Sequence, residues 1–306
     1  MEPVLEVKNL TKKFGNFTAV DNISFSIGDG EILGVLGRNG AGKTTTIQML
    51  LGVMDQTEGS IEYFGKSLVK NREEILKQIN FSSTYISMPW QFTILEILQV
   101  YAMLYEIPDK KKRIVKLLQE FEIEHLIKKQ FNMLSAGEKT RLMLTKAFLN
   151  YPKVILLDEP TASLDPEIAI KIREFLKKER EEYNVSMLLT THNMSEAEEM
   201  SDRVMVLNEG KIIAQDTPEN LTKSISNCKI ELYIPKDDDK AKAFFEKEQI
   251  SFKKQKKYFN IPVNEQEIAI FLTKVANAEI KYEEISIEKP TLEDYFLGII
   301  GEKNHD

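Results

Sequence analysis

Three runs of mostly apolar residues indicate an α/β protein. Residues 32–36, 154–157 and 185–191 are short and largely uninterrupted by charge, as is typical of strands buried on both faces of a parallel sheet. Residues 4–10 and 23–27 predict a pair of antiparallel strands that lead, through the Asp29-Gly30 turn, into the first apolar run. Residues 60–64 predict a further strand.

From about residue 81 to residue 150 the pattern is helical instead. Apolar residues recur at the spacing of one helix face over residues 94–104 and again over residues 114–121. Further along, residues 204–207 and 211–214 flank the turn Asn208-Glu209-Gly210 and predict a β-hairpin. Thr217-Pro218-Glu219 then predicts the start of a helix with proline at its first position.

After about residue 226 the pattern changes to short alternating segments. Strands are expected over residues 229–234, 252–263 and 280–287, with helices over about 238–248 and through about 275. Two repeats of strand, helix and strand predict a small α+β module, for which a ferredoxin-like arrangement is one candidate. Thr291 and Asp294 predict the cap of a last helix over residues 292–300.

Composition narrows the functional classes. The chain has 306 residues, enough for a full α/β core and more than one domain. Its 41 basic and 48 acidic residues give a net charge of −7, so no nucleic-acid partner is expected. A single cysteine fits a reducing compartment. We expect neither a secretory signal nor a membrane span, so any membrane role requires a partner.

Candidate chemistry begins directly after the first apolar run. Residues 37–44 follow the pattern glycine, four residues, glycine, lysine, threonine, which between a strand and a helix is typical of a phosphate-binding loop. Glycines let backbone N–H groups close around phosphate oxygens, the helix N-terminus favours anions, and Lys43 supplies a positive charge. Thr44 is expected to offer its hydroxyl to Mg²⁺. The expected nucleotide contacts are Gly37, Arg38, Asn39, Gly40, Ala41, Gly42, Lys43, Thr44 and Thr45.

Two acidic residues end the second apolar run. Asp158 and Glu159 stand at the carboxyl end of the predicted strand, where open α/β sheets bind their ligands. We expect Asp158 to hold Mg²⁺, directly or through water, and Glu159 to polarise an attacking water as general base. The simpler interpretation is a solvated acidic loop.

The third motif is Leu134-Ser135-Ala136-Gly137-Glu138, which a helical pattern follows. With it, the chain resembles the nucleotide-binding subunit of ATP-binding cassette (ABC) transporters. The signature of that family usually reads Leu-Ser-Gly-Gly-Gln, so Ala136 and Glu138 are departures. The resemblance implies that Ser135 and Gly137, with Glu138 beside them, meet the nucleotide bound by the opposite protomer. Ser135 and Glu138 also form a capping-box pattern, and both roles can hold together.

Further positions match the family in order. Asp165 resembles the acidic residue of the loop that links the two protomers, although before Pro166 it is equally an ordinary helix N-cap. His192 stands where the family has its switch histidine and is expected to contact the γ-phosphate. Phe14 matches the aromatic residue that stacks on adenine, with Phe17 as a substitute and a core role as the alternative for either.

One family feature is missing. The position that normally holds a glutamine is Thr84, and in the family that glutamine touches Mg²⁺ or the attacking water and relays the state of the membrane partner. Slower hydrolysis or a different coupling contact therefore stays open. Candidates for the contact with the membrane subunit, or else for core positions, are Tyr85, Met88, Trp90 and Phe92.

The resemblance implies a P-loop ABC-type ATP-binding domain of the α/β class over residues 1–220. It has an antiparallel β subdomain and a helical subdomain at about 81–150. Residues 227–306 are expected to form the α+β accessory domain, which resembles, more weakly, those of bacterial exporters of the ABC-2 class.

The implied function is that of an ATPase using ATP and Mg²⁺, with Lys43, Glu159 and His192 as catalytic residues. Two copies of the chain would close around ATP and drive export through a separate polytopic membrane permease subunit. We expect a cytoplasmic protein, bound peripherally at the inner face of the cell membrane. A soluble ABC-type ATPase acting on ribosomes or DNA and a weakly hydrolysing, nucleotide-gated regulatory module remain alternatives.

Overall fold

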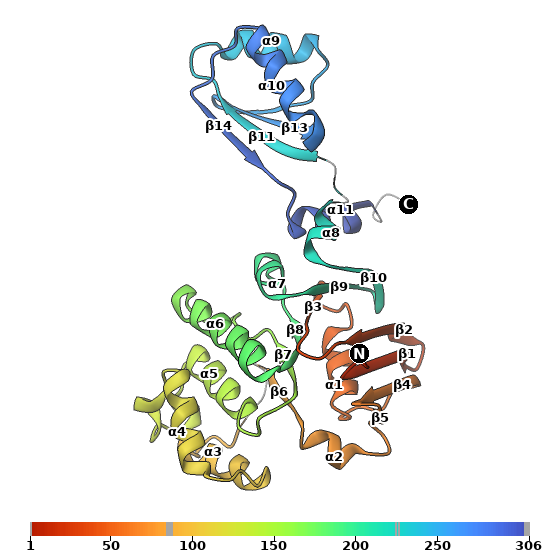
Figure 1. Cartoon of the computed structure of the whole chain (residues 1–306), viewed down its shortest axis with the longest axis vertical. Helices are drawn as coiled ribbons and strands as arrows, with labels where there is room; N and C mark the ends of the chain where they lie inside the picture. The colour runs from red at the N-terminus through yellow and green to blue at the C-terminus, as the bar shows by residue number, and fades with distance from the viewer. Residues whose placement is uncertain (1, 84–87, 224, 226, 303–306) are drawn as a thin grey trace. The chain divides into compact units, whose positions relative to one another are not determined.

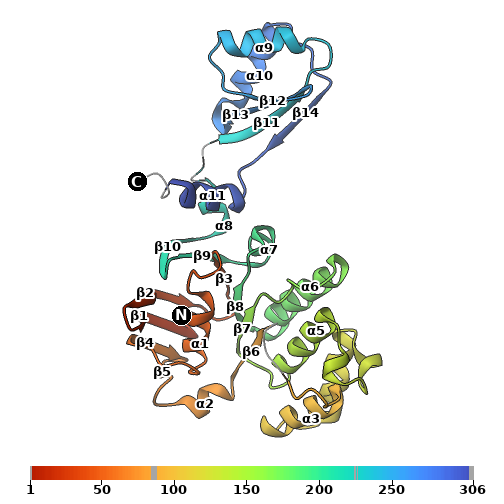
Figure 2. The same cartoon turned by 180° about the vertical axis from the view of Figure 1, so that it is seen from behind.

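The computed structural model describes residues 2–83, 88–223, 225 and 227–302. The chain divides into two compact units, Met1–Pro218 and Glu219–Asp306 (Figures 1 and 2). Each unit has its own buried apolar core. Thr84 and Tyr85, for which the sequence predicts the glutamine-loop position and a partner contact, lie outside the described residues.

A six-stranded sheet runs through the first unit in the order β10-β9-β3-β8-β7-β6. Strands β9, β3, β8, β7 and β6 are parallel, and β10 pairs antiparallel with β9 at one edge. The predicted apolar runs are the adjacent strands β3, β8 and β7, and the predicted hairpin is β9 with β10. The strands are β3 (Ile32–Leu36), β6 (Ile79–Ser83), β7 (Val154–Asp158), β8 (Ser186–Thr190), β9 (Arg203–Asn208) and β10 (Lys211–Asp216).

Both faces of the parallel strands are buried. Successive side chains of a strand point to opposite sides, so the two faces pack in different cores. In β7, Ile155 and Leu157 pack in the core formed with the helices. Val154 and Leu156 pack instead in the core shared with the antiparallel sheet. The uninterrupted apolar run therefore reflects two cores, one on each side of the strand.

The predicted antiparallel subdomain is a four-stranded sheet in the order β2-β1-β4-β5. Its first strand is longer than the sequence predicts, since β1 continues to Phe14 past register shifts around Asn9, whose φ is 50°. The irregularity masks the continuation of the strand in the sequence pattern. The strands are β1 (Leu5–Phe14), β2 (Phe17–Ile27), β4 (Glu58–Tyr63) and β5 (Lys66–Ser67).

Helices α3 to α6 gather on one side of the parallel strands, and the antiparallel sheet lies on the other (Figures 1 and 2). The 3-10 turns Glu124–Leu126 and Phe131–Met133 lie between α4 and α5 in sequence. The helices of the first unit are α1 (Lys43–Leu50), α2 (Arg72–Leu76), α3 (Ile94–Leu104), α4 (Lys110–Glu120), α5 (Ala136–Ala147), α6 (Pro166–Tyr183) and α7 (Met194–Met200).

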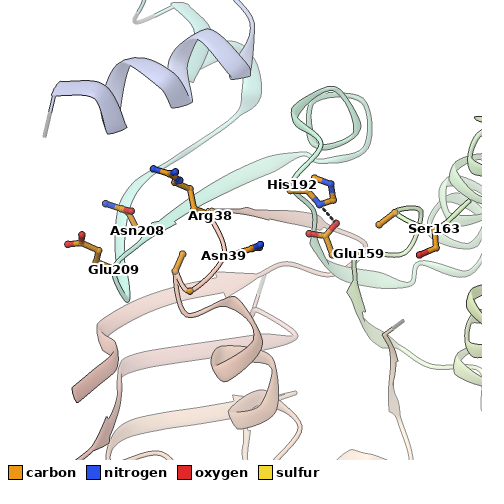
Figure 3. Close-up of a pocket in the computed structure, with 11 residues that line it drawn as sticks. Arg38, Asn39, Glu159, Ser163, His192, Asn208 and Glu209 are labelled. Atoms are coloured by element: carbon orange, nitrogen blue, oxygen red, sulfur yellow. Dashed lines mark hydrogen bonds and ion pairs between the residues drawn. The ribbon is translucent and has the colours of Figure 1, made fainter. Parts of the chain in front are cut away.

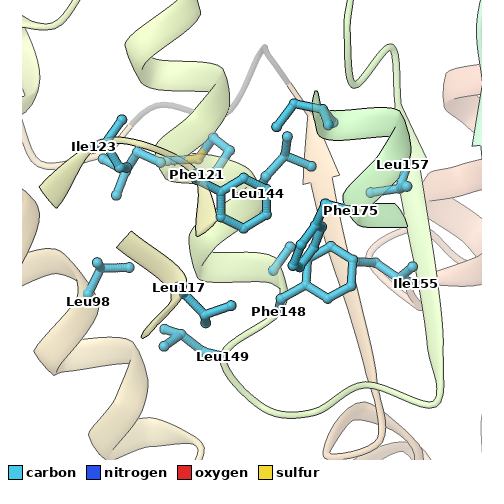
Figure 4. Close-up of a cluster of buried hydrophobic side chains, with 14 of the residues drawn as sticks. Leu98, Leu117, Phe121, Ile123, Leu144, Phe148, Leu149, Ile155, Leu157 and Phe175 are labelled. Atoms are coloured by element: carbon cyan, nitrogen blue, oxygen red, sulfur yellow. The ribbon is translucent and has the colours of Figure 1, made fainter. Parts of the chain in front are cut away.

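Three phenylalanine rings fill the centre of the helical core (Figure 4). The ring of Phe175 in α6 lies 4.6 Å from that of Phe121 and 4.9 Å from that of Phe148, measured between centroids. Tilted and edge-on aromatic contacts of this kind are favourable. They hold the end of α5 against α6, the helix that follows the loop of Glu159.

The helical prediction from about residue 81 is wrong at its start, because Ile79–Ser83 is the parallel strand β6. Its polar residues hide the strand from the sequence pattern, since Asn80, Ser82 and Ser83 are buried there. The Asn80 amide donates to Asn150 Oδ1 at 2.8 Å. Leu104, predicted to share the apolar face of α3, is 70% exposed at the last residue of the helix.

The second unit contains the antiparallel sheet β12-β13-β11-β14, whose core includes residues of helices α9 and α10. This order of elements and strands is the split β-α-β, ferredoxin-like arrangement. The predicted cap of the last helix is confirmed, since Asp294 N donates to Thr291 Oγ1 at 3.3 Å. The elements are α8 (Pro218–Lys223), β11 (Asn227–Tyr233), α9 (Asp238–Lys247), β12 (Lys253–Gln255), β13 (Tyr258–Asn264), α10 (Ile268–Asn277), β14 (Glu284–Glu288) and α11 (Leu292–Glu302).

Candidate active site

The predicted phosphate loop connects β3 to α1, and two of its glycines are required by close packing. A Cβ on Gly37 would lie 2.6 Å from the carbonyl oxygen of Leu207. Gly42, the N-cap of α1, has φ 105°, and a Cβ there would lie 2.7 Å from the carbonyl oxygen of Ala19. Both spacings are too short for a side chain, so the loop backbone stays exposed at the helix N-terminus, where anions bind favourably.

Lys43 folds back over this loop. Its Nζ donates to the carbonyl oxygens of Gly37 and Arg38. Burial lowers the pKa of Lys43, and the Glu159 and Asp158 carboxylates oppose that shift by favouring the charged form. The ammonium group therefore lies within electrostatic reach of both acids that the sequence singles out.

The threonines that follow Lys43 differ in their surroundings. Thr46 is buried and its Oγ1 donates to the Gly42 carbonyl oxygen at 2.9 Å, which closes the first turn of α1. Thr44 is exposed and Thr45 is partly buried. Thr44 therefore presents a hydroxyl at the start of α1, as a Mg²⁺ ligand of a phosphate loop must do.

Asp158 ends β7 as a buried carboxylate. Its Oδ1 accepts a hydrogen bond from Thr190 Oγ1 at 2.6 Å, and its Oδ2 accepts one from Ser83 Oγ at 3.2 Å. The two hydroxyls come from the neighbouring strands β8 and β6 and fix the orientation of the carboxylate. An oriented carboxylate together with the Thr44 hydroxyl is an oxygen-only donor set, which suits Mg²⁺ that keeps water and phosphate oxygens as its other ligands.

Glu159 and His192 form a pair at the carboxyl ends of β7 and β8. His192 Nδ1 lies 2.7 Å from Glu159 Oε2, and the His192 side chain is 68% exposed while that of Glu159 is 15% exposed. The backbone of Glu159 is left-handed, with φ 53°, and its N–H donates to the Thr190 carbonyl oxygen at 3.0 Å. This uncommon conformation costs about 1 to 3 kcal/mol and is frequent at active sites.

A cavity of about 880 Å³ joins these parts (Figure 3). Its lining brings residues 37–41 of the phosphate loop together with Glu159 and His192. The other predicted residues of this region are not among the described residues that line it: Gly42, Lys43, Thr44, Thr45 and Asp158. Ala162 and Ser163 line it as well, and so do Asn208 and Glu209. The complete lining is Gly37, Arg38, Asn39, Gly40, Ala41, Glu159, Ala162, Ser163, His192, Asn208 and Glu209.

Asn208 and Glu209 were not predicted as site residues. They belong to the turn between β9 and β10, which the sequence identifies only as a hairpin. The turn reaches the phosphate loop because Gly210 N donates to the Ala41 carbonyl oxygen at 3.1 Å. Nothing in the local pattern signals that long-range contact.

The predicted family signature lies at the N-terminus of α5, and its capping box is formed. Ser135 Oγ accepts from Glu138 N at 3.2 Å, and the Glu138 carboxylate accepts from Ser135 N at 2.7 Å. Lys129 also donates to Glu138, and this bond lowers the pKa of the Glu138 carboxyl most, with Ser135 N contributing. The Glu138 side chain is therefore engaged within its own chain.

Gly137 allows α5 to approach the loop after β7. A Cβ on Gly137 would lie 3.1 Å from the carbonyl oxygen of Ser163, which is a tight contact. Among the described residues, those that line the cavity do not include Ser135, Gly137 or Glu138. The signature therefore packs beside Ser163, a residue of the cavity lining, without lining the cavity itself.

The remaining predicted positions also lie outside the cavity lining. Phe14 ends β1 with its ring 48% exposed, and Lys12 Nζ lies 5.2 Å from the ring centroid. The core role considered for Phe14 and Phe17 is wrong, since Phe17 is 64% exposed. Asp165 occupies the N-cap position of α6 before Pro166 but makes no side-chain cap hydrogen bond.

Two of the predicted partner contacts are exposed and one is not. Trp90 is 70% exposed and Phe92 is 42% exposed. Met88 is buried, and the Tyr101 hydroxyl donates to its Sδ at 3.6 Å, so Met88 is a core residue and not a surface anchor. In the part of the chain that the structure describes, none of the helices combines the length and apolar character needed to cross a bilayer.

Comparison with known proteins identifies the family of this chain. The family described as ABC transporter matches residues 20–162. A bacitracin transport ATP-binding protein of Bacillus licheniformis is 36% identical over 223 residues, which cover 73% of this chain and 72% of that protein. The chain belongs to the ABC transporter family, as an ATP-binding subunit. An uncharacterized ABC transporter ATP-binding protein of Bacillus subtilis is 30% identical over 311 residues, covering 100% of this chain and 99% of that one.

A third relative and two solved structures extend the comparison. A Nod factor export ATP-binding protein of Ralstonia nicotianae is 34% identical over 74% of this chain and 71% of that protein. An ABC transporter ATP-binding subunit of known structure has a TM-score of 0.68 and 29% identity over 72% of this chain and 92% of that one. A dimeric ATP-binding cassette in a post-hydrolysis state with ADP and Pi has a TM-score of 0.66 and 25% identity over 70% of this chain and 98% of that one. This ABC subunit accordingly binds ATP and is an ATPase.

Proposed function

We propose that two copies of this ABC subunit close around MgATP and that the cycle of closure and hydrolysis powers export through a separate polytopic membrane protein. The observation that carries the proposal is the open cavity in which the phosphate loop faces the Glu159–His192 pair. The signature residues Ser135 and Gly137 are not among the described residues that line this cavity, which supports their supply by a second copy.

Each nucleotide is held chiefly by one chain. The backbone N–H groups of the phosphate loop and the Lys43 ammonium bind the phosphates. The Thr44 hydroxyl and the Asp158 carboxylate hold Mg²⁺, which neutralises charge on the phosphates when bound. Phe14 offers an exposed ring face on which adenine can stack.

Glu159 and His192 act on the attacking water. The Glu159 carboxylate accepts a hydrogen bond from the water and orients it, while His192, 2.7 Å from that carboxylate and 68% exposed, reaches the γ-phosphate. Ser135, Gly137 and Asp165 of the second copy complete the site from the opposite side. Positioning and charge compensation carry most of the catalysis in phosphoryl transfer.

The contact with the membrane subunit is assigned to an exposed apolar surface made of Trp90, Phe92 and Met133. The two segments lie together, since Asn132 N donates to the Trp90 carbonyl oxygen at 3.2 Å. Met133 is 66% exposed. Exposed aromatic and methionine side chains are typical interface anchors. The subunit then works from the cytoplasmic face of the membrane. Export as the direction is supported by the relative from Ralstonia nicotianae, which is described as a Nod factor export ATP-binding protein.

The test is affinity purification of tagged Glu159→Gln protein from its native cells, in detergent with MgATP, followed by mass spectrometry. A polytopic membrane protein in stoichiometric amount is expected. Trp90→Glu should release that protein while retaining ATP, whereas Val69→Glu, a change at an equally exposed apolar residue elsewhere (72%), should not. Recovery of ribosomal proteins or nucleic acid without a membrane protein would favour the soluble-ATPase alternative.

A further inference from the structure

A buried carboxylate lies behind the active site and bridges its two loops. Glu196, in the first turn of α7, is 3% exposed. Its Oε1 accepts a hydrogen bond from Thr161 Oγ1 at 2.6 Å, and its Oε2 accepts one from Thr191 Oγ1 at 2.7 Å. Both oxygens of the side chain are therefore used, each by a different loop.

The two threonines belong to the segments that carry the catalytic pair. Thr161 follows Glu159 in the loop between β7 and α6, and Thr191 directly precedes His192. His192 Nδ1 in turn lies 2.7 Å from Glu159 Oε2, so the two loops also meet through these side chains. A ring of contacts thus runs from Glu159 through the two threonines and Glu196 to His192 and back.

The position of Glu196 is itself fixed. Its backbone N–H donates to Asn193 Oδ1 at 3.2 Å, and Asn193 N donates to Thr191 Oγ1 at 3.0 Å. The N-terminus of α7 also favours a negative charge. Among the described residues no lysine, arginine or histidine forms an ion pair with Glu196, so the two hydroxyls and the helix N-terminus have to offset its burial.

If Glu196 served only to fill space, its burial would cost free energy that an apolar side chain would not cost. A buried carboxylate without an ion-pair partner loses its hydration, whereas an apolar side chain of similar size would fill the same space without that cost. What the carboxylate adds is geometry, because two acceptor oxygens on a rigid group hold two hydroxyls at a set separation. The catalytic pair needs such support, since Glu159 has a left-handed backbone and His192 is largely exposed.

We propose that Glu196 is a positioning residue for ATP hydrolysis. It joins the loop of Glu159 to the loop of His192 by hydrogen bonds. The Glu159 carboxylate and the His192 imidazole are thereby held at a fixed distance and orientation. Glu196 touches no part of the phosphate loop, so its loss lowers the catalytic rate and leaves the binding of ATP unchanged. The inference rests on the proposed roles of Glu159 and His192.

The first experiment compares Glu196→Ala and Glu196→Gln in the full-length protein. For Glu196→Ala, kcat should fall at least about tenfold, since small misplacements of catalytic groups cost up to about a hundredfold. KM and the dissociation constant for ATP should stay within about twofold. Glu196→Gln should lie between parent and alanine variant, because its amide oxygen accepts from one threonine while its NH₂ donates to the other. Glu198→Gln, which removes an exposed carboxylate from the same helix, is the matched control and should match the parent.

The second experiment asks whether the threonines act through Glu196. Thr161→Val and Thr191→Val should each lower kcat in the parent, and each should change it by less than about twofold in the Glu196→Ala background. Such non-additivity is the mark of residues that share one network. Melting temperatures identify folded variants, and if alanine at position 196 unfolds the protein, the glutamine variant takes its place in both experiments.

Two outcomes overturn the inference. One is a folded Glu196 variant whose kcat stays within about twofold of the parent. The other is a loss of kcat matched by an equal loss of ATP affinity, which would indicate a general structural defect. Failure of the proposed function is distinct, since the parent protein itself would then show no turnover.

Discussion

At the scale of single residues, Lys43 is the most direct probe of the nucleotide site. It stands within electrostatic reach of Asp158 and Glu159 and bonds to the loop that it serves. Lys43→Ala should weaken ATP binding by about 10- to 100-fold, because charged hydrogen bonds contribute about 1.5 to 3 kcal/mol. Titration calorimetry measures the dissociation constant.

Lys70→Ala is the control for Lys43→Ala, since Lys70 is exposed in the same unit and away from the cavity. Its ATP affinity should equal that of the parent. An unchanged dissociation constant for Lys43→Ala itself would contradict the assignment of the phosphate loop.

Lys146 provides a test by pH. Its ammonium group is buried in α5, where Nζ donates to Asn80 Oδ1 and to the Phe81 carbonyl oxygen, both at 3.0 Å. Burial lowers the pKa of Lys146 from 10.5 to about 8. Between these values the unfolded chain binds a proton that the folded chain does not, so the free energy of unfolding rises with pH across the window.

The gain between pH 8 and pH 10.5 should be about 3 kcal/mol, at 1.36 kcal/mol per unit of pKa. Lys146→Met should abolish this gain in the free energy of unfolding. The contributions of the other titrating groups are the same in both proteins and cancel in the difference between parent and variant. Urea unfolding followed through Trp90, the single tryptophan, measures both proteins. If the free energies of unfolding of the parent and of Lys146→Met change equally with pH over this range, burial does not destabilise the Lys146 ammonium.

Residue types and spacing were sufficient to single out Glu159 and His192, which the structure brings together, but not the contacts that support them. Glu159 and His192 each end an apolar run, so their meeting at one sheet edge follows from the parallel topology. Glu196 carries no such signal, because a glutamate in a short polar helix looks solvated. Its burial depends on two threonines from other loops, and only the folded chain brings the three together.

At the scale of elements, helix α5 raises the question whether Ser135 is a cap, a phosphate ligand, or both. Aspartate is as good an N-cap as serine, but its charge repels a phosphate. Ser135→Asp should therefore change the unfolding free energy by less than about 0.5 kcal/mol and lower ATP turnover at least about tenfold. Denaturation and a steady-state ATPase assay give the two quantities.

The matched control lies at the start of α3, where Thr93 and Glu96 form a capping box of the same kind. Thr93→Asp places the same charge beside the same type of glutamate, at a helix start that contains none of the predicted nucleotide contacts. Turnover should be unaffected there. If Ser135→Asp keeps the ATP turnover of the parent, Ser135 is a helix cap and not a phosphate ligand.

Elements with uniform patterns were predictable, and elements with buried polar residues were not. The apolar runs of β3, β7 and β8 and the amphipathic faces of α3 and α4 predicted their own structures. Strand β6 was not predicted, because its buried polar residues Asn80, Ser82 and Ser83 give it the pattern of a polar segment. Hydrogen bonds from Asn80 to Asn150 and from Ser83 to Asp158 make that burial tolerable.

At the scale of the whole molecule, the two units have separate cores, and we expect ATP binding to depend on the first unit alone. Phe245 is fully buried in the second core, with the rings of Phe259 and Phe252 5.5 and 5.6 Å away. Phe245→Ala should destabilise that unit by about 3 to 5 kcal/mol. Calorimetry should show one transition lowered, with the ATP affinity unchanged.

Phe148→Ala, in the helical core of the first unit, is the counterpart of Phe245→Ala. It should lower the other transition and weaken ATP turnover. If Phe245→Ala lowers ATP turnover as strongly as Phe148→Ala does, the two units are not independent in function.

The central claim is that two copies of the chain share the nucleotide. Sedimentation of Glu159→Gln with and without MgATP tests it most directly, because loss of the general base should trap the closed state before hydrolysis. The account predicts a monomer without nucleotide and a dimer with two bound ATP molecules when MgATP is present. A Glu159→Gln protein that binds ATP fully and remains monomeric would contradict it.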